Sequence, residues 1–226
     1  MHSYEIEIKV LLWNRENRNA FFDAVTLRFP EIRKVSHEAQ KNHYFEWGNI
    51  LSLLTLFRSY LSEEKYAKFE KLAHEGKSFS VRTRGMETHT ILVVKATLND
   101  ETSENGTQRI EWEGDLFPMT LDTMDQLVLD AGYIYQAKWS REREEYALDD
   151  RTTLDLDKNA WYGYLAEFER VIDDETKIAD TREEILDIIH SLWYDELPQD
   201  RLARMFDFYN KHWNEYYGTE KVFTVL

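Results

Sequence analysis

The stretch EIEIKV, Glu5–Val10, alternates strictly between charged and apolar side chains. A β-strand places successive side chains on opposite faces, so Glu5, Glu7 and Lys9 share one face and the apolar residues between them share the other. In one interpretation the charged face meets solvent, as charged strand faces usually do. In the other, covering helices bury the apolar face and the charged face lines the inside of a barrel.

The same alternation recurs along the chain. After a first strand at 4–13, the pattern predicts strands at 42–47, 78–84, 88–97, 107–114, 133–148, 151–157 and 162–172. Most of these carry charges two residues apart or a single charge within an apolar run. Together they offer eight carboxylates and seven cations: Glu5, Glu7, Lys9, Arg82, Arg84, Lys95, Arg109, Glu111, Glu113, Arg141, Arg143, Asp155, Asp157, Glu167 and Glu169.

Helical spacing and capping signals predict helices between and after these strands. They cover 15–29, 62–74, 118–131 and 181–217, the last broken once at Leu197-Pro198, whereas the apolar stretch 51–60 is ambiguous. Short connections between successive strands favour antiparallel pairing, and eight antiparallel strands can remove their edges by closure. The expected fold class is therefore α+β: an eight-stranded antiparallel closed β-barrel with a charged interior and helices packed outside. We expect one domain over 1–226, with a helical C-terminal part from about 174–226.

Composition narrows the partners and the chemistry. With 28 Lys and Arg against 43 Asp and Glu, the formal charge is −15, which repels nucleic acid and anionic lipid in general. The chain has no cysteine, so disulfides, thiolate metal sites and cysteine nucleophiles are excluded. The acidic start fits no signal peptide and no apolar run is long enough to span a bilayer, so we expect a cytoplasmic protein without a nucleic-acid or membrane partner.

A barrel interior lined with charges must hold water and a ligand, because a charge withdrawn from water costs several kcal/mol unless it is paired or solvated. Carboxylates on neighbouring strands suit a hard divalent cation with oxygen ligands. Arginine and lysine suit a multiply charged anion, and arginine can bind phosphate oxygens through two parallel hydrogen bonds. Together these groups are typical of a site for a metal-chelated polyphosphate.

The order of the motifs resembles that of the CYTH family, the triphosphate tunnel metalloenzymes. The resemblance rests on EIEIK, VRTR, VVK, RIEWE, REREEY, LDLD and GYLAEFE in that order, and it runs from Glu5 to Glu169. It implies a charged tunnel and a Mg²⁺- or Mn²⁺-dependent reaction on a triphosphate.

The resemblance also implies roles for individual residues. The metal-binding carboxylates would be Glu5, Glu7, Glu167 and Glu169, with Glu111, Glu113 and Asp157 as further acidic tunnel positions. The phosphate-binding cations would be Lys9, Arg82, Arg84, Lys95, Arg109, Arg141 and Arg143, all but Arg109 also counted as catalytic. Asp155 matches less securely, and Gly163 fits the glycine that precedes the last acidic pair.

The expected activity is hydrolysis of a triphosphate with release of phosphate. The substrate could be inorganic tripolyphosphate, a nucleoside triphosphate or thiamine triphosphate. The alternatives are a class IV adenylyl cyclase, which forms cyclic AMP and pyrophosphate from ATP, and a polyphosphate-binding module without catalysis. A homodimer is left open. Of the histidines, His37 and His43 lie near the second expected strand and could contact a substrate.

Overall fold

The computed structural model describes residues 4–97 and 109–225, and the chain divides into two compact units. The terminal unit comprises Met1–Ala39 and Ser140–Leu226, and the middle unit comprises Gln40–Trp139. Strands β2 (Arg33–Glu46) and β6 (Ile134–Ala147) each contribute residues to both units. The expectation of one domain stays a prediction.

Eight strands form one sheet in the order β1-β8-β7-β6-β2-β3-β4-β5. The other bounds are β1 (Tyr4–Leu11), β3 (Ser78–Gly85), β4 (Thr90–Thr97), β5 (Arg109–Asp115), β7 (Thr153–Asn159) and β8 (Gly163–Ile172). The α+β class and the eight antiparallel strands are confirmed. Within the described ranges β1 and β5 are the end strands and do not pair, so closure of the barrel by hydrogen bonds is not confirmed.

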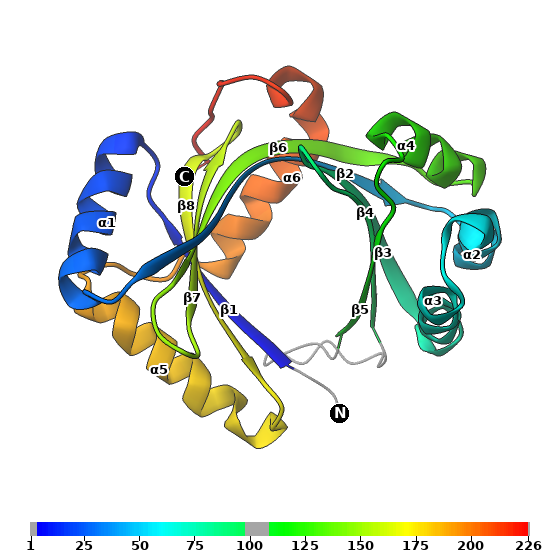
Figure 1. The fold of residues 1–226 in the computed structure, drawn as a ribbon. Helices are drawn as coiled ribbons and strands as arrows, with labels where there is room; N and C mark the ends of the chain where they lie inside the picture. The colour runs from blue at the N-terminus through cyan, green and yellow to red at the C-terminus, as the bar shows by residue number, and fades with distance from the viewer. Residues whose placement is uncertain (1–3, 98–108, 226) are drawn as a thin grey trace. The chain divides into compact units, whose positions relative to one another are not determined.

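Two helices cover one face of the strands of the terminal unit. Figure 1 shows α1 (Arg15–Arg28) and α5 (Ile178–Ser191) on the same side of β1, β7 and β8. The Asn14 side chain begins α1 by accepting a hydrogen bond from the Asn17 amide at 2.9 Å. The buried core beneath the helices combines strand and helix residues, among them Ile6, Ile8, Val10, Phe21, Val25, Leu154, Phe168, Ile185 and Ile189.

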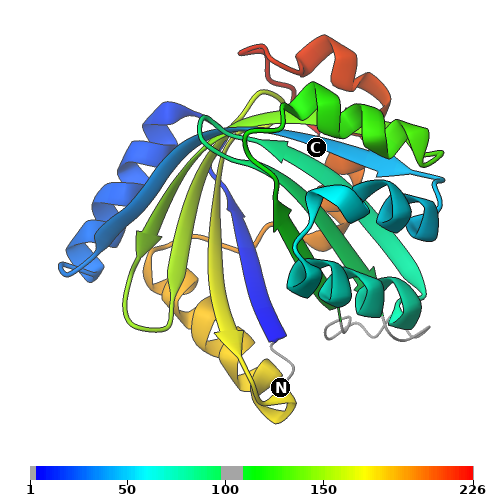
Figure 2. The ribbon, with the colours of Figure 1, turned by 45° about the vertical axis from the view of Figure 1, so that its right-hand side comes forward.

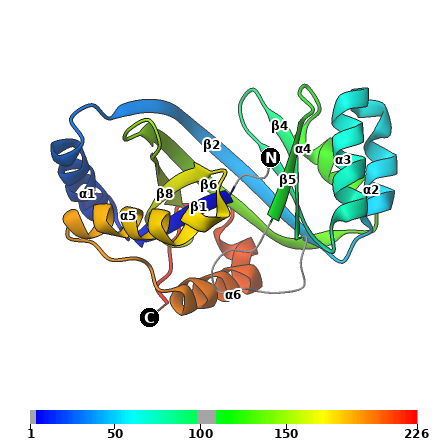
Figure 3. The same ribbon diagram turned by 90° about the horizontal axis from the view of Figure 1, so that it is seen from below.

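Three helices cover one face of the strands of the middle unit. They are α2 (Ile50–Phe57), α3 (Glu63–Glu75) and α4 (Leu121–Asp130), which lie on one side of β3, β4 and β5 (Figure 2, Figure 3). Ser62 caps α3, as its sequence position predicts. The ambiguous stretch 51–60 belongs to α2 and the short 3₁₀ helix η1 (Arg58–Tyr60), and it buries Leu53, Leu54 and Phe57.

The C-terminal part continues from the 3₁₀ helix η2 (Glu175–Lys177) into α5 and then α6 (Gln199–Tyr216). The expected helix break is present, although α5 already ends at Ser191 and Pro198 then stands at the cap of α6. The Leu197 amide donates to the Lys9 carbonyl at 2.7 Å, which fixes this connection to β1. No helix in the described ranges is long and apolar enough to cross a membrane.

Strand β2 differs most from the sequence expectation, because it begins at Arg33 and not at 42. Apart from the exposed Val35 and Ala39 its first half is polar, so it gives only a weak alternating signal. Side chains connect this half to β6: Lys34 lies 2.5 Å from Glu144, and His37 Nε2 lies 2.8 Å from Glu142. The expected turn at 105–106 lies outside the described residues.

Candidate functional site

In the terminal unit the charged residues of β1 occupy the face opposite the helices. Ile6, Ile8 and Val10 are buried in the core with α1 and α5, whereas Glu5 and Glu7 are exposed. Within this unit the apolar faces therefore pack beneath helices, as the second interpretation of EIEIKV requires.

Strand register brings the predicted residues of this unit into rows. Glu7 is opposite Glu169, and Lys9 is opposite Glu167, which is in turn opposite Asp155. The next row places Asp157 opposite Arg143 of β6. Glu145, which sequence reasoning missed, extends the Lys9 row because it is opposite Asp155. Its spacing of two from Arg143 could have identified it.

Arg143 is the centre of this charged face. Its Nε and one terminal nitrogen each donate to Asp157 at 2.7 Å, and it also forms ion pairs with Asp155 and Glu167. Arg141 donates to the same Asp157 carboxylate at 3.0 Å. Because Asp157 is fully buried, its carboxylate fixes the positions of both guanidinium groups. Its predicted role as a metal ligand stays a prediction.

The two acidic residues beside Arg143 have opposite pKa shifts. Burial opposes ionisation of Glu167, but the charges of Lys9 (at 3.2 Å) and Arg143 outweigh it and lower its pKa to about 2. Burial raises the pKa of Asp155 to about 7, since the Arg143 charge only partly compensates and neighbouring carboxylates add to the rise. Glu167 is therefore ionised at neutral pH, whereas burial favours the neutral form of Asp155.

In the middle unit the charged residues also face away from the helices. Val81, Leu92 and Val94 are buried against α2, α3 and α4. The alternate positions of β3 and β4 point to the other face, and they include Arg82, Arg84 and Lys95. Two acidic partners come from β5: Lys95 lies 2.8 Å from Glu111, and Arg84 lies 3.8 Å from Glu113. Arg109 pairs with Thr97 through its backbone, and its side chain lies outside the described part of the chain.

A cavity of about 380 Å³ lies against this charged face. Its lining combines two cations with hydroxyl groups: Arg82, Lys95, Tyr44, Ser78, Ser80 and Thr97, beside Phe79, Val93 and Ala96. Cations and hydroxyl donors together suit the oxygen atoms of an anion such as phosphate.

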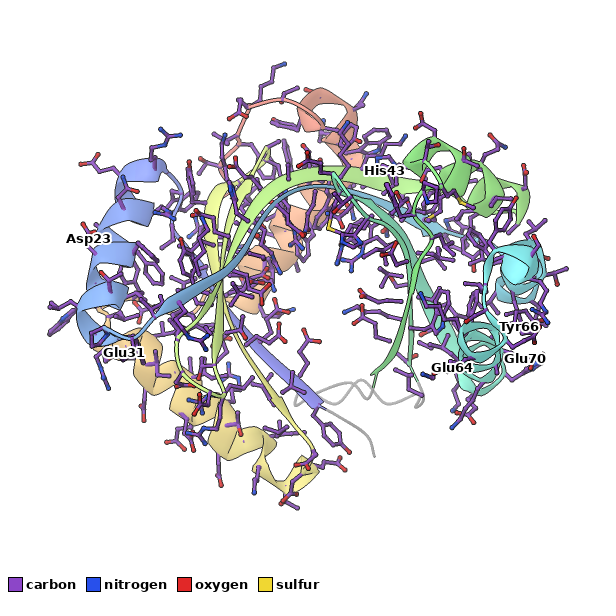
Figure 4. All side chains as sticks on the ribbon, viewed as in Figure 1. Asp23, Glu31, His43, Glu64, Tyr66 and Glu70 are labelled. Atoms are coloured by element: carbon purple, nitrogen blue, oxygen red, sulfur yellow. The ribbon has the colours of Figure 1, made fainter. Side chains whose placement is uncertain are left out.

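Sequence reasoning missed the residues of β2 that hold Arg82 and Arg84. Arg82 donates to the Tyr44 hydroxyl at 2.9 Å, and Arg84 donates to the Asn42 side-chain oxygen at 3.1 Å. His43, between them, is buried and lies 2.6 Å from Asp125 of α4, in the region where β2 approaches that helix (Figure 4). His43 therefore points away from the charged face, and the expectation of a substrate contact is wrong for it.

The carboxylates at the exposed end of the terminal unit's charged face fit a divalent cation by their chemistry. Glu5 and Glu7 are exposed on β1, and Glu169 of β8 stands opposite Glu7. In the described part of the chain, no three His, Asp or Glu side chains already form a group that could hold a metal. Mg²⁺ commonly binds to one or two carboxylates and completes its shell with waters and substrate phosphates.

No protein-family model matches the sequence. No curated protein matches it either. Solved structures do resemble it. The PH1819 protein of Pyrococcus horikoshii OT3 has a TM-score of 0.61 at 16% identity, with 91% of this chain and 99% of that chain covered. The PH1012 protein of the same organism has a TM-score of 0.59 at 16% identity, with 86% and 95% covered.

A third neighbour is described as a proposed adenylate cyclase from Vibrio parahaemolyticus. Its TM-score is 0.57 at 15% identity, with 92% of this chain and 99% of that chain covered. At such low identity these likenesses show the fold alone. They support a CYTH-like fold, in agreement with the order of the sequence motifs.

Proposed function

We propose that the protein is a metal-dependent triphosphatase. Water attacks the terminal phosphorus of a triphosphate, the bond to the bridging oxygen breaks, and orthophosphate is released with the diphosphate product. The observation that carries the proposal is the strand face of each unit opposite its helices, which combines the cations and carboxylates of the CYTH-like motifs. Phosphoryl transfer needs mainly positioning and charge stabilisation, and these are what such faces supply.

The cations bind and orient the phosphates in this proposal. Arg141 and Arg143 are held by Asp157, so less side-chain entropy is lost when they bind phosphate oxygens. Lys9 supplies a point charge in the adjacent row. In the middle unit Arg82, Arg84 and Lys95 have the same role, and the proposal extends it to Arg109.

The carboxylates of the two charged faces would hold the divalent ion, Mg²⁺ or Mn²⁺. In the terminal unit these are Glu5, Glu7 and Glu169, with Glu167 and Asp157 deeper on the same face; in the middle unit they are Glu111 and Glu113. When bound, the ion neutralises phosphate oxygens and can activate water. Carboxylate ligands must be ionised, so metal binding weakens in acid.

The test is to change Glu5 or Glu169 to Gln and to measure Mg²⁺-dependent phosphate release from tripolyphosphate, ATP and thiamine triphosphate. We expect metal-dependent turnover to fall at least about 10-fold in each variant, because mutation of residues that only hydrogen-bond to metal ligands already reduces activity by that factor. Glu183→Gln, an exposed change on α5, is the matched control and should leave turnover unchanged. Wild-type turnover in both site variants would contradict the assignment.

A class IV adenylyl cyclase is the second candidate, favoured by the likeness to the Vibrio parahaemolyticus protein. In that reaction the ribose 3′-hydroxyl attacks the α-phosphorus, and pyrophosphate leaves as cyclic AMP forms. Product analysis with ATP separates the two activities, because hydrolysis gives ADP and orthophosphate. Tight binding of tripolyphosphate without turnover of any substrate would instead favour a non-catalytic polyphosphate-binding module.

A further inference from the structure

Consecutive cross-strand pairs between β2 and β3 have alternating roles. In the antiparallel register Asn42 is opposite Arg84, His43 is opposite Thr83, and Tyr44 is opposite Arg82. Side chains alternate between faces along a strand, so the first and last pairs share the charged face. The middle pair lies on the other face, beneath α4.

Both outer pairs are joined by a hydrogen bond to an arginine. The Tyr44 hydroxyl accepts from a terminal nitrogen of Arg82 at 2.9 Å, and the Arg82 guanidinium carbon lies 5.4 Å from the Tyr44 ring centroid. The Tyr44 ring also packs on Trp139, with centroids 4.9 Å apart. Asn42 is buried, and its side-chain oxygen accepts from Arg84 Nε at 3.1 Å. Each arginine is thus held by a residue that is itself fixed.

The middle pair is anchored to α4 through Asp125. His43 Nδ1 lies 2.6 Å from one Asp125 oxygen, and the Thr83 hydroxyl donates to the other at 2.6 Å. Tyr135 of β6 donates to the same carboxylate at 2.7 Å. A slip of one residue would exchange the two faces of a strand, so fixing the middle pair beneath the helix fixes the arginine pairs on the charged face.

We propose that Asn42 and Tyr44 are positioning residues for Arg82 and Arg84, and that they preorganise the two guanidinium groups to bind phosphate. The inference rests on the proposed function, because it deepens the role of residues assigned to the substrate. A free arginine loses side-chain entropy when it binds, and a guanidinium held at one nitrogen has already lost part of it.

The test is a double-mutant cycle read by calorimetric binding of inorganic tripolyphosphate without metal. Tyr44→Phe keeps the ring against Trp139 and removes only the hydroxyl. We expect it to weaken binding by about 3- to 10-fold, the range of one net hydrogen bond. In an Arg82→Ala background the same change should have no effect, because a residue that acts through Arg82 has nothing left to position. In a Lys95→Ala background its effect should persist.

Asn42→Ala forms the second cycle, with Arg84→Ala. Thermal unfolding of every variant checks that the fold is retained, and the Tyr44 cycle decides the inference if buried Asn42 does not tolerate replacement. If each partner change weakens binding by the same factor with and without its arginine, the inference is overturned. Binding of tripolyphosphate by the wild type would in that case still support the proposed function. If the wild type binds none of tripolyphosphate, ATP and thiamine triphosphate, with or without Mg²⁺, the proposed function fails and the positioning role fails with it.

Discussion

Glu7 of β1 and Glu169 of β8 are direct register partners, so two carboxylates stand opposite one another on the charged face of the terminal unit. Like charges in such a position destabilise a sheet by roughly 0.2–1 kcal/mol. Lys9 forms an ion pair with Glu7 and compensates part of the repulsion. A divalent cation bound there would compensate more, so under the proposed function this pair would link stability to metal binding.

We therefore predict that Glu169→Gln changes the stability of the metal-free protein by no more than about 1 kcal/mol, because the change removes one of two opposed charges at a cross-strand pair. Under the proposed function we expect Mg²⁺ to raise the melting temperature of the wild type, since ligand binding to the folded state stabilises it, and the same change should reduce that rise. Thermal unfolding with and without Mg²⁺ measures both effects. Glu183→Gln should alter neither, and an undiminished Mg²⁺ effect in Glu169→Gln would contradict the assignment of Glu169.

Asp157 should behave differently from Glu169 because it is buried and paired with two arginines. We predict that Asp157→Asn lowers the free energy of unfolding by about 3–5 kcal/mol without metal, since it breaks the buried ion pairs that this carboxylate forms with two arginines. Urea unfolding measures the loss. Glu111→Gln breaks the partly exposed pair with Lys95 and serves as the control, at a cost of at most about 1 kcal/mol. Equal costs would contradict the structural role of Asp157.

The sequence predicted which face of each strand is charged, because alternation is a local property. Ile6 and Phe168 each lie between two glutamates and each is buried under helices. The first half of β2 was missed because it is mostly polar and exposed, and because its side chains pair with residues of β6 that lie far away in the chain. Local spacing cannot reveal such partners.

The same limit applies inside the site. Asp125 lies in a helix whose spacing predicts only an amphipathic surface, yet it is the buried acceptor for His43 and Thr83. The resemblance to the CYTH family implied a metal-binding role for Asp157, and only the fold reveals its contact with Arg143. Closure of the sheet likewise depends on whether its two end strands pair, and alternation within a strand does not predict that.

The backbone conformation at Gly163 favours glycine, and a substitution can test this requirement. Its φ is +80°, and a Cβ placed there would lie 1.9 Å from the Trp13 carbonyl oxygen. We predict that Gly163→Ala lowers the free energy of unfolding by clearly more than the roughly 1–2 kcal/mol cost of the left-handed conformation alone. Gly218→Ala is the matched control: its φ is +70° and a Cβ there meets no atom within 4 Å. Equal losses in urea unfolding would show that the contact with Trp13 does not matter.

The buried carboxylate of Asp125 should make stability depend on pH. Burial opposes its ionisation, but the hydrogen bonds from His43 and Thr83 outweigh burial and hold its pKa below the usual value. Because the folded-state pKa lies below the unfolded one, ionised Asp125 contributes stability fully above the unfolded pKa of about 3.9. That contribution is lost as the pH falls through the lower folded-state pKa.

We predict that Asp125→Asn lowers the free energy of unfolding near neutral pH by about 1.5–3 kcal/mol, the range for hydrogen bonds to a charged group. The difference from wild type should shrink as the pH falls below about 4, where the wild-type carboxyl becomes protonated. Urea unfolding from pH 7 to pH 2.5 measures it. Asp122→Asn, an exposed change in the same helix, should parallel the wild type throughout. If the difference for Asp125→Asn stays constant over this range, the carboxylate charge is not what stabilises the contact between α4 and the β2–β3 pair.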